Sequence, residues 1–396
     1  MSKVYSELNP PTRLLLGPGP SNVDPRVLRA MATPLIGHLD PEFIKIMDDV
    51  KQLLQYAFQT ENYLTLPVSG TGSAAMEAAL VNAIEPGDSV LVCVAGLFAE
   101  RMCDIVERCQ GKLIRIDAEW GRPIDPSQVE AVLKQSKVKI VAIVHAETST
   151  GVLQPLDDIG RLAPEHGALF LVDTVTSLGG CPVKVDEWKL DIVYSGTQKC
   201  LSCPPGMGPI TFSPAASKGL EARKTKVQSW YLDMAMVRRY WDQERFYHHT
   251  APITMCYALR EALRIVYEEG LEARWQRHKL NHLALMAGLQ AMGLRPLVQE
   301  GYRLPSLNSI RIPEGTDDAK VRGRLLREYN IEIGGGLGKL KGKIWRIGLM
   351  GYNSSPQTVR TFLTALEALL RTEAPSVKAG AALPAAEAVW AKGPTP

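Results

Sequence analysis

The chain has 396 residues, which is enough for two or three domains of ordinary size. Its hydrophobic fraction of 45% and charged fraction of 22% are typical of globular proteins and exclude a disordered or fibrous chain. The formal net charge of +3 is too slight to indicate a nucleic acid or an anionic membrane as a partner. No apolar run approaches the roughly 18 residues that span a bilayer, and the first residues do not resemble a signal peptide, so we expect a cytoplasmic protein.

The first 20 residues are rich in proline and predict an irregular arm rather than a core element. A short helix is expected after Asp24-Pro25, and apolar spacing near 3.6 predicts an amphipathic helix over 41–59. Strand-like and helix-like segments then alternate up to about residue 196. The strand-like runs are YLTLPV, DSVLVCVA, KLIRID, VKIVAIVH, ALFLVD and DIVYSG. Because these runs are continuously apolar, they indicate a parallel sheet that helices bury on both faces.

From about residue 254 the pattern changes to long helices followed by short strands, which suits a smaller α+β domain. The Ala- and Pro-rich tail has few large apolar residues, and we expect it to carry no fold. The predicted organisation is an N-terminal arm (1–20), a large domain (21–270), a small C-terminal domain (271–372) and a low-complexity tail (373–396).

The seven cysteines are scattered and odd in number, which predicts reduced thiols. Cys200 and Cys203 form a single C-x-x-C pair. A zinc site would need a second ligand pair, and a redox pair would favour a helix N-terminus, whereas Pro204-Pro205-Gly206 follows here. We therefore expect no metal and no redox function.

Small and polar residues follow several of the strand-like runs, at the sheet edge where α/β proteins bind ligands. The segment 69–73, Ser-Gly-Thr-Gly-Ser, leads from the first run into a helix. Its small residues and the free N–H groups of the helix start would suit a phosphate. A plain tight turn is an equal alternative, and the string GTGSAA also matches a dinucleotide-binding pattern.

Three ionisable residues also follow these runs. Asp173 ends a buried run, where a carboxylate needs a partner such as a cationic ring nitrogen, although it could also cap a helix. Lys199 lies between a buried run and a Pro-rich turn, where desolvation would lower its pKa as a Schiff-base lysine requires; an ordinary solvated lysine is the alternative. His145 is an acid/base candidate, but a structural histidine is more common there. The adjacent His248 and His249 are not expected to be metal ligands.

A phosphate cradle, a carboxylate and a lysine at strand carboxyl ends together meet the requirements of pyridoxal 5'-phosphate (PLP). The phosphate anchors the cofactor, the carboxylate keeps the pyridine nitrogen protonated, and the lysine forms an imine with the aldehyde. These residues lie in the segments GTGS, LVDTVTSLGG and YSGTQKCLSCPPG.

From about Leu14 to about Arg371, the sequence resembles the class V, fold-type I PLP-dependent aminotransferases, and most closely the alanine–glyoxylate and serine–glyoxylate (serine–pyruvate) aminotransferases. Further motifs that carry the resemblance are LLLGPGPSNV, EAALVNAIEPGDS, ETSTGVLQPLD, RKTK, YHHTAPI, EIGGGLG and RIGLMG. The resemblance implies a large domain with a mostly parallel sheet of the seven-stranded type, covered by helices, and a smaller α+β C-terminal domain. It also implies amino transfer from alanine or serine to glyoxylate, giving pyruvate or hydroxypyruvate and glycine, by a ping-pong mechanism.

The resemblance also assigns roles to residues. Lys199 looks like the imine-forming lysine, Asp173 like the partner of the pyridine nitrogen, and Val175 like the residue that packs on the ring. Arg346 looks like the clamp for the substrate carboxylate, with Gly19 beside the substrate. The motifs place no second arginine opposite Arg346, so we expect small monocarboxylate amino acids and 2-oxo acids as substrates.

The remaining cofactor contacts implied by the resemblance are Thr71, Gly72, Ser73 and Gln198 at the phosphate, Phe98 stacked on the ring, Thr148 beside its oxygen substituent, and Tyr247 and Thr250 from the other subunit of a homodimer. Some relatives carry His where this chain has Ser73 and Trp where it has Phe98. Both changes make the site smaller without removing a catalytic function.

Three alternatives remain at this point besides a serine–pyruvate aminotransferase. An NAD-dependent dehydrogenase needs an acidic residue about 20 positions after the glycines; Asp88 has nearly this spacing but precedes the next strand, and Lys199 would have no role. A cysteine desulfurase needs a nucleophilic thiol in the small domain, whereas Cys256 precedes that domain. The third alternative is a binding protein without catalytic activity.

Overall fold

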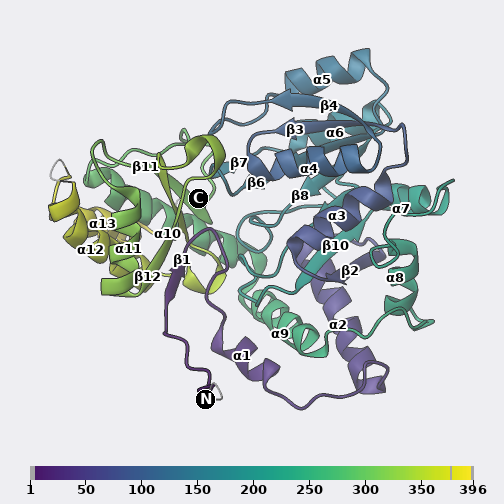
Figure 1. The fold of residues 1–396 in the computed structure, drawn as a ribbon, viewed down its shortest axis with the longest axis horizontal. Coiled ribbons are helices and arrows are strands. Elements are labelled where there is room, and N and C mark those ends of the chain that lie inside the picture. The colour runs from purple at the N-terminus through teal and green to yellow at the C-terminus, as the bar shows by residue number, and fades with distance from the viewer. Residues whose placement is uncertain (1–4, 375–376, 394–396) are drawn as a thin grey trace, which may run out of the picture.

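The structure is a computed structural model that describes residues 5–374 and 377–393. Two β-sheets organise it, a larger one built from residues 64–212 and a smaller one built mainly from residues 307–348 (Figure 1). The larger sheet has the strand order β2-β10-β9-β8-β5-β3-β4. Its strands are β2 (Leu64–Ser69), β3 (Ser89–Val94), β4 (Lys112–Asp117), β5 (Ile140–Val144), β8 (Leu169–Asp173), β9 (Ile192–Tyr194) and β10 (Met207–Phe212). The predicted seven-stranded, mostly parallel sheet is confirmed.

Strand β10 is the antiparallel member of this sheet and was not predicted from the sequence. It runs antiparallel to both of its neighbours, β2 and β9. Two successive reversals leave β2 pointing in the same direction as β9, β8, β5 and β3. The carboxyl ends of these five strands therefore meet at one edge of the sheet, which is where ligands bind in α/β folds.

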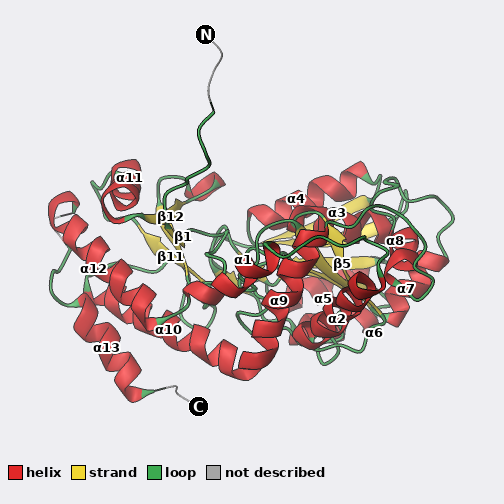
Figure 2. Cartoon of the chain, turned by 90° about the horizontal axis from the view of Figure 1, so that it is seen from below, coloured by secondary structure: helices red, strands yellow, loops and turns green. Residues whose placement is uncertain are grey.

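Helices bury the larger sheet on both faces. Figure 2 shows α3 and α4 on one face and α2, α5 and α6 on the other. The strands β5, β9 and β10 are buried at every residue, in agreement with their continuous apolar runs. The helices of this part are α1 (Pro25–Met31), α2 (Pro41–Phe58), α3 (Gly72–Ala83), α4 (Leu97–Arg108), α5 (Pro126–Gln135), α6 (Asp157–Glu165), α7 (Pro214–Glu221), α8 (Met234–Trp241) and α9 (Ile253–Glu269); a hairpin of β6 (Ala146–Glu147) and β7 (Val152–Leu153) lies between β5 and α6.

The smaller sheet has the order β1-β12-β13-β11 and a hydrophobic core of its own. Its strands are β1 (Leu14–Leu16), β11 (Leu307–Arg311), β12 (Ile331–Gly335) and β13 (Ile344–Gly348), and its helices are α10 (Leu271–Ala291), α11 (Asp318–Tyr329) and α12 (Pro356–Glu373). The prediction of an irregular arm over 1–20 is wrong at residues 14–16. This apolar triplet pairs in parallel with Ile331–Ile333, and Leu16 is fully buried, because the edge of β12 offers backbone partners 317 residues further along the chain.

The prediction that the tail carries no fold is also wrong. Residues Ala382–Lys392 form α13, which packs on α10 and α12. Ala382 and Ala386 are fully buried, and Trp390 Nε1 donates a hydrogen bond to Asn281 Oδ1 (3.1 Å). Alanine has the highest helix propensity and lets helices approach closely, so the tail needs few large apolar residues to dock. Residues 375–376 and 394–396 of the predicted tail lie outside the described residues.

None of the helices in the described part of the chain combines the length and the apolar character needed to cross a bilayer.

The docking of α13 predicts that a charge at its buried face destabilises the protein. We expect Ala386→Asp to lower the free energy of unfolding by roughly 2–4 kcal/mol, because the carboxylate is buried without a partner. Ala388→Asp places the same charge on the exposed face of the same helix and should cost far less. Urea unfolding of both variants measures the difference, and equal losses would contradict the packing described here.

Candidate active site

A cavity of about 150 Å³ lies at the shared carboxyl edge of the larger sheet. It is lined by Gly72, Ser73, Met76, Phe98, Arg101, Val144, Ala146, Thr148, Asp173, Val175, Gln198 and Lys199. All of these residues except Met76, Arg101, Val144 and Ala146 are site residues predicted from the sequence. The fold therefore brings together side chains that are up to 127 positions apart in the chain.

Asp173 ends β8 and holds a buried carboxylate on the cavity wall. Its Oδ1 accepts a hydrogen bond from Val175 N and its Oδ2 accepts one from Tyr194 Oη, both at 2.8 Å. Tyr194 ends the neighbouring strand β9, directly opposite Asp173 in the register. Burial raises the pKa of Asp173 to about 6, whereas the two donors favour its ionised form. No described helix begins at Asp173, so the alternative of a helix cap has no support.

Lys199 follows β9 by five residues, and its side chain is buried in the same cavity. Its Nζ donates to the carbonyl oxygen of Pro18. Burial lowers the pKa of this amine from 10.5 to about 8, so a useful fraction is unprotonated and nucleophilic near neutral pH. Gly19 has a φ of +104°, and a Cβ there would lie 2.5 Å from Lys199 Nζ. Only glycine fits this approach of the N-terminal segment to the lysine.

The N-terminus of α3 forms the end of the cavity where we predicted a phosphate. No side-chain cap occupies this helix start in the described structure, so its first N–H groups are available to an anion. A Cβ on Gly72 would lie 3.3 Å from Val175 Cγ2, so this turn packs closely against Val175, the residue that we predicted to pack on the ring. Gln198 Oε1 is buried without a hydrogen-bond partner among the described residues. Thr71 and Ser73 are exposed in the single chain.

Phe98 enters the cavity from the first turn of α4, together with Arg101 one turn later. The guanidinium carbon of Arg101 lies 4.8 Å from the centre of the Phe98 ring. Arg101 is thus a second arginine at the cavity, and the sequence motifs did not indicate it. The spacing of three residues on a predicted helix was the signal that could have revealed Arg101.

Glu147 supports the start of α4 and was not predicted as a site residue. Its Oε1 accepts hydrogen bonds from Ser149 N (3.0 Å) and Ser149 Oγ (2.5 Å), and Ser149 Oγ accepts one from Leu97 N (3.0 Å). A Cβ on Gly96 would lie 2.5 Å from the Glu147 side chain, so the strand-to-helix turn is packed directly on this carboxyl group. Burial raises the pKa of Glu147 to about 7. The pair Glu147–Ser149 therefore fixes the helix start that carries Phe98.

Arg346 reaches the site from the smaller sheet, where it lies on the inner strand β13. Its Nε donates to Gly335 O (2.7 Å) and its Nη1 to Thr148 O (3.1 Å), so it connects the smaller sheet to the β6–β7 hairpin. Thr148 Oγ1 in turn shares a hydrogen bond with Thr176 Oγ1 (2.7 Å). No carboxylate of the described residues lies within ion-pair distance of Arg346, although its side chain is buried. A substrate carboxylate would supply the missing counter-charge.

Tyr247 and Thr250 do not reach the cavity of this chain. Both lie in the exposed segment between α8 and α9, and Tyr247 is 55% exposed. Its ring packs near His38, with 5.4 Å between the ring centres. Their contribution to a cofactor site within a dimer remains a prediction.

His145 is a structural residue. It is 3% exposed, its Nδ1 shares a hydrogen bond with Ser177 Oγ (3.0 Å), and it packs edge-on against Trp188. Burial lowers its pKa to about 3, so it stays neutral under ordinary conditions. The described residues contain no group of three or more His, Cys, Asp or Glu side chains that could hold a metal ion.

The residues of the cavity fit PLP. The helix start of α3 suits the phosphate, Asp173 suits a cationic ring nitrogen, and the desolvated Lys199 suits the aldehyde. With its large mostly parallel sheet and a smaller α+β unit that supplies Arg346, the molecule has the fold-type I architecture of PLP-dependent enzymes.

Comparison with known proteins identifies the family. The family model "Aminotransferase class-V" matches residues 14–358, and the chain belongs to this family of PLP-dependent transaminases. It is 43% identical over 402 residues to the (S)-ureidoglycine–glyoxylate transaminase of Bacillus subtilis, covering 97% of each chain. It is 44% identical over 368 residues to the alanine–glyoxylate aminotransferase of Callithrix jacchus, covering 92% of this chain and 89% of the relative. The crystal structure of an alanine–glyoxylate aminotransferase from Nostoc sp. superposes with a TM-score of 0.92 at 51% identity, covering 93% and 98% of the two chains.

The family assignment leaves the dehydrogenase and desulfurase alternatives without support. Asp88 accepts hydrogen bonds from Glu85 N (2.7 Å) and Lys139 Nζ (2.6 Å) in a turn, which is a structural role. Cys256 is fully buried within α9 and cannot serve as an exposed nucleophile.

The burial of Asp173 predicts a dependence of stability on pH in the cofactor-free protein. Its folded pKa of about 6 exceeds the usual value near 3.9, so the unfolded state ionises first as the pH rises. This carboxylate therefore destabilises the fold progressively between about pH 4 and pH 6. We expect the unfolding free energy of Asp173→Asn minus that of the unchanged protein to grow by up to about 3 kcal/mol over this window.

Urea unfolding at a series of pH values measures this difference, and Asp158→Asn controls for the loss of an exposed carboxylate. A difference that does not change between pH 4 and pH 7 would show that Asp173 is not perturbed in the folded chain.

Proposed function

We propose that this transaminase moves the amino group of a small amino acid, alanine or serine, to glyoxylate and releases glycine. The observation that carries the proposal is the buried, unpaired guanidinium of Arg346 beside Thr148 and Lys199, which provides one carboxylate site. Relatives named for different amino donors, alanine and ureidoglycine, share glyoxylate as the acceptor in their names. The acceptor therefore has broader support than the donor.

Each residue of the site has a task in such a transfer. PLP, when bound, supplies an electron sink for the bond changes at the substrate's α-carbon. The Asp173 carboxylate holds a positive charge at the ring nitrogen, with Tyr194 and Val175 keeping that carboxylate in place. Lys199 Nζ carries the proton that leaves or joins the α-carbon, and its lowered pKa suits both directions of proton transfer. Because one cavity serves both half-reactions, donor and acceptor bind in turn, as in ping-pong kinetics.

The assignment of a small monocarboxylate substrate is based on the charges near Arg346. A dicarboxylate such as 2-oxoglutarate would bring a second negative charge that needs its own partner, at a cost of several kcal/mol when it is buried unpaired. Arg101 is the available second cation, but its guanidinium lies over the Phe98 ring at an exposed position. We therefore assign Arg101 to the support of Phe98 and not to substrate binding.

The acceptor preference tests this proposal. We expect kcat/KM for glyoxylate to exceed that for 2-oxoglutarate by at least about 100-fold with alanine or serine as donor. Arg346→Lys should raise KM steeply, because a point charge cannot replace a planar fork. Arg101→Ala should leave the ratio of the two acceptors unchanged. Equal use of 2-oxoglutarate that disappears in Arg101→Ala would show that Arg101 binds a second carboxylate and that the monocarboxylate assignment is wrong.

We also propose that the enzyme is a homodimer in which Tyr247 and Thr250 complete the cofactor site of the partner subunit. Their exposure in the single chain and their distance from its cavity support this proposal. Lys199→Ala removes the catalytic amine, and a Tyr247→Phe/Thr250→Val double variant removes the contacts donated across the interface. Each variant alone should lose most activity.

In a mixture of the two variants, a mixed dimer contains one site with both sets of native residues. We therefore expect about a quarter of native activity after random reassociation of equal amounts. Activity that stays at the sum of the two separate variants would contradict a shared site. Loss of the Lys199-dependent visible absorbance of bound PLP in the lysine variant alone verifies that each substitution acts as intended.

A further inference from the structure

The turn that carries Lys199 is held at three successive backbone carbonyl groups. Ser21 N donates a hydrogen bond to Gln198 O (2.9 Å), and Ser21 Oγ donates one to Lys199 O (2.9 Å). Arg274 Nη2 donates to the next carbonyl, Cys200 O (2.6 Å). Ser21 lies in the N-terminal segment and Arg274 in α10, so segments that are distant in the chain fix the backbone of the lysine.

Two serine hydroxyls connect this turn to the segment that follows β13. The amide of Tyr352 donates to Ser202 Oγ (2.7 Å). Ser202 Oγ lies 3.3 Å from Ser21 Oγ, which donates to Lys199 O. An amide N–H can only donate and a carbonyl can only accept, so Ser202 gives its proton to Ser21. Both serines are 4% exposed, and the three hydrogen bonds form one buried connection from Tyr352 to Lys199, which we call the serine bridge.

Ser202 holds its hydroxyl in the serine bridge with an unfavourable backbone conformation. Its φ of +50° lies in the left-handed region, which residues other than glycine adopt at a cost. A Cβ on Gly351 would overlap Ser202 Oγ and lie 2.6 Å from Cys200 O, so the segment after β13 packs directly on the lysine turn. Because glycine would suit the backbone of Ser202 better, the hydroxyl is what a serine contributes at this position.

Both outer ends of the serine bridge lead back to the smaller sheet, which carries Arg346. Ser21 follows β1, the strand that pairs with β12, and Tyr352 follows the last residue of β13 by four positions. A Cβ on Gly348 at the end of β13 would overlap the carbonyl oxygen of Gly17, so the two segments are also packed against each other. The smaller sheet is therefore attached to the lysine turn through two of its strands.

Helix α10 adds a third attachment to the same turn. Arg274 and Arg277 both form ion pairs with Glu269, each at 2.5 Å. Arg274 holds Cys200 O, and Arg277 Nη1 donates to Gly351 O (3.0 Å). This charged group thus binds the lysine turn and the segment after β13 together.

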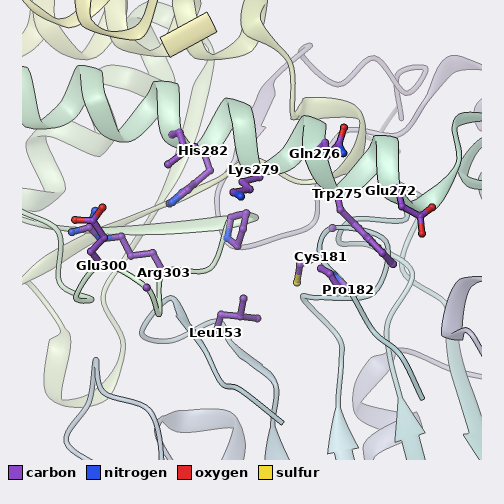
Figure 3. Close-up of a pocket in the computed structure, with 14 residues that line it drawn as sticks. Leu153, Cys181, Pro182, Glu272, Trp275, Gln276, Lys279, His282, Glu300 and Arg303 are labelled. Carbon is purple, nitrogen blue, oxygen red and sulfur yellow. The ribbon is translucent and has the colours of Figure 1, made fainter. Parts of the chain in front are cut away.

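A separate cavity of about 420 Å³ lies along another face of α10, between this helix, the turn 180–182 and the loop 300–305. Figure 3 shows Trp275, Lys279 and His282 on its α10 side. The residues that line it differ from those that form the serine bridge and its attachment to α10. The connection between Tyr352 and Lys199 is therefore built independently of this cavity.

We propose that Ser21 and Ser202 are positioning residues that set the separation between the Lys199 amine and the Arg346 guanidinium. Burial and the positive charge of Arg346 both lower the pKa of Lys199, so the two cations act on each other across the site. An α-amino acid carries its amino group and its carboxylate on one carbon. It can engage the cofactor at Lys199 and the guanidinium of Arg346 together only when their separation is fixed. The inference rests on the roles proposed above for these two residues.

Hydrogen–deuterium exchange of the PLP-loaded enzyme tests the serine bridge itself. We expect Ser202→Gly to speed exchange of the Tyr352 amide at least about fivefold, because this N–H loses its acceptor. Gln110→Gly is the matched control: Gln110 is exposed, has a φ of +58° and lies outside the catalytic cavity, so its replacement should leave the Tyr352 amide unchanged. Mass spectrometry of peptides that contain Tyr352 measures the rates. Unchanged exchange in Ser202→Gly overturns the inference.

Two amines test the consequence for substrate binding. The amino acid alanine has a carboxylate for Arg346, and ethylamine is the same molecule without it. We measure the amine concentration that gives half of the change in visible absorbance of bound PLP, without an acceptor. In Ser202→Gly and in Ser21→Ala this concentration should rise at least about fivefold for alanine and less than about twofold for ethylamine. In an Arg346→Lys background, Ser202→Gly should add less than about twofold for alanine, because both act on one interaction.

Ser202→Ala separates positioning from a merely structural role. It lacks the hydroxyl but keeps the left-handed strain, so it should unfold at a lower urea concentration than Ser202→Gly and respond to alanine in the same way. The inference is overturned if the alanine response of the two variants follows their stability, if it equals that of the unchanged enzyme, or if ethylamine is affected as much as alanine. An unchanged enzyme that does not respond to alanine would contradict the proposed function alone, and the exchange of the Tyr352 amide then decides the inference.

Discussion

The direction of five strands is the constraint on which the rest of the molecule depends. Strands β2, β3, β5, β8 and β9 all end at one edge of the larger sheet. Strand β10 lies between β2 and β9 in the sheet and is antiparallel to both, so β2 and β9 run in the same direction. The segments that follow these strands supply almost every group of the catalytic cavity. Backbone hydrogen bonds within the sheet are satisfied, so its edge can hold side chains that would otherwise be costly to bury.

The two ionisable groups at this edge are tuned in opposite directions by the same cause. Desolvation raises the pKa of Asp173 and lowers that of Lys199, so each group is brought toward neutral pH. Tyr194 and the backbone of Val175 hold the carboxylate, and the N-terminal segment around Pro18 and Gly19 closes over the amine. A cofactor with a cationic ring nitrogen and an aldehyde compensates both effects when it binds.

The smaller sheet contributes a residue directly to the site. Arg346 projects from the inner strand β13 and donates a hydrogen bond to Thr148 O in the turn of the β6–β7 hairpin, so the placement of the smaller sheet against this hairpin sets where the proposed carboxylate site lies. The same arrangement creates the separate cavity beneath α10, whose walls come from both parts of the chain. Because β1 pairs with β12 and α13 packs on α10 and α12, segments near both ends of the described chain contribute to this architecture.

The sequence by itself determined the sheet type, the positions of its main strands along the chain, the residues after them and the family, because buried parallel strands have continuous apolar runs and motif residues follow those runs directly. It did not reveal β1, β10 or α13, whose pairing and packing partners are distant in the chain, nor Glu147, Tyr194 and Arg101 at the site. Tyr194 sits inside an apolar strand and meets Asp173 only through the register of two neighbouring strands. The cavity beneath α10 likewise exists only in the folded chain, since its charged and apolar walls come from segments more than a hundred residues apart. The local sequence pattern determines which secondary structure each segment forms. Contacts between distant segments are decided by tertiary packing, which cannot be derived from a short window of sequence.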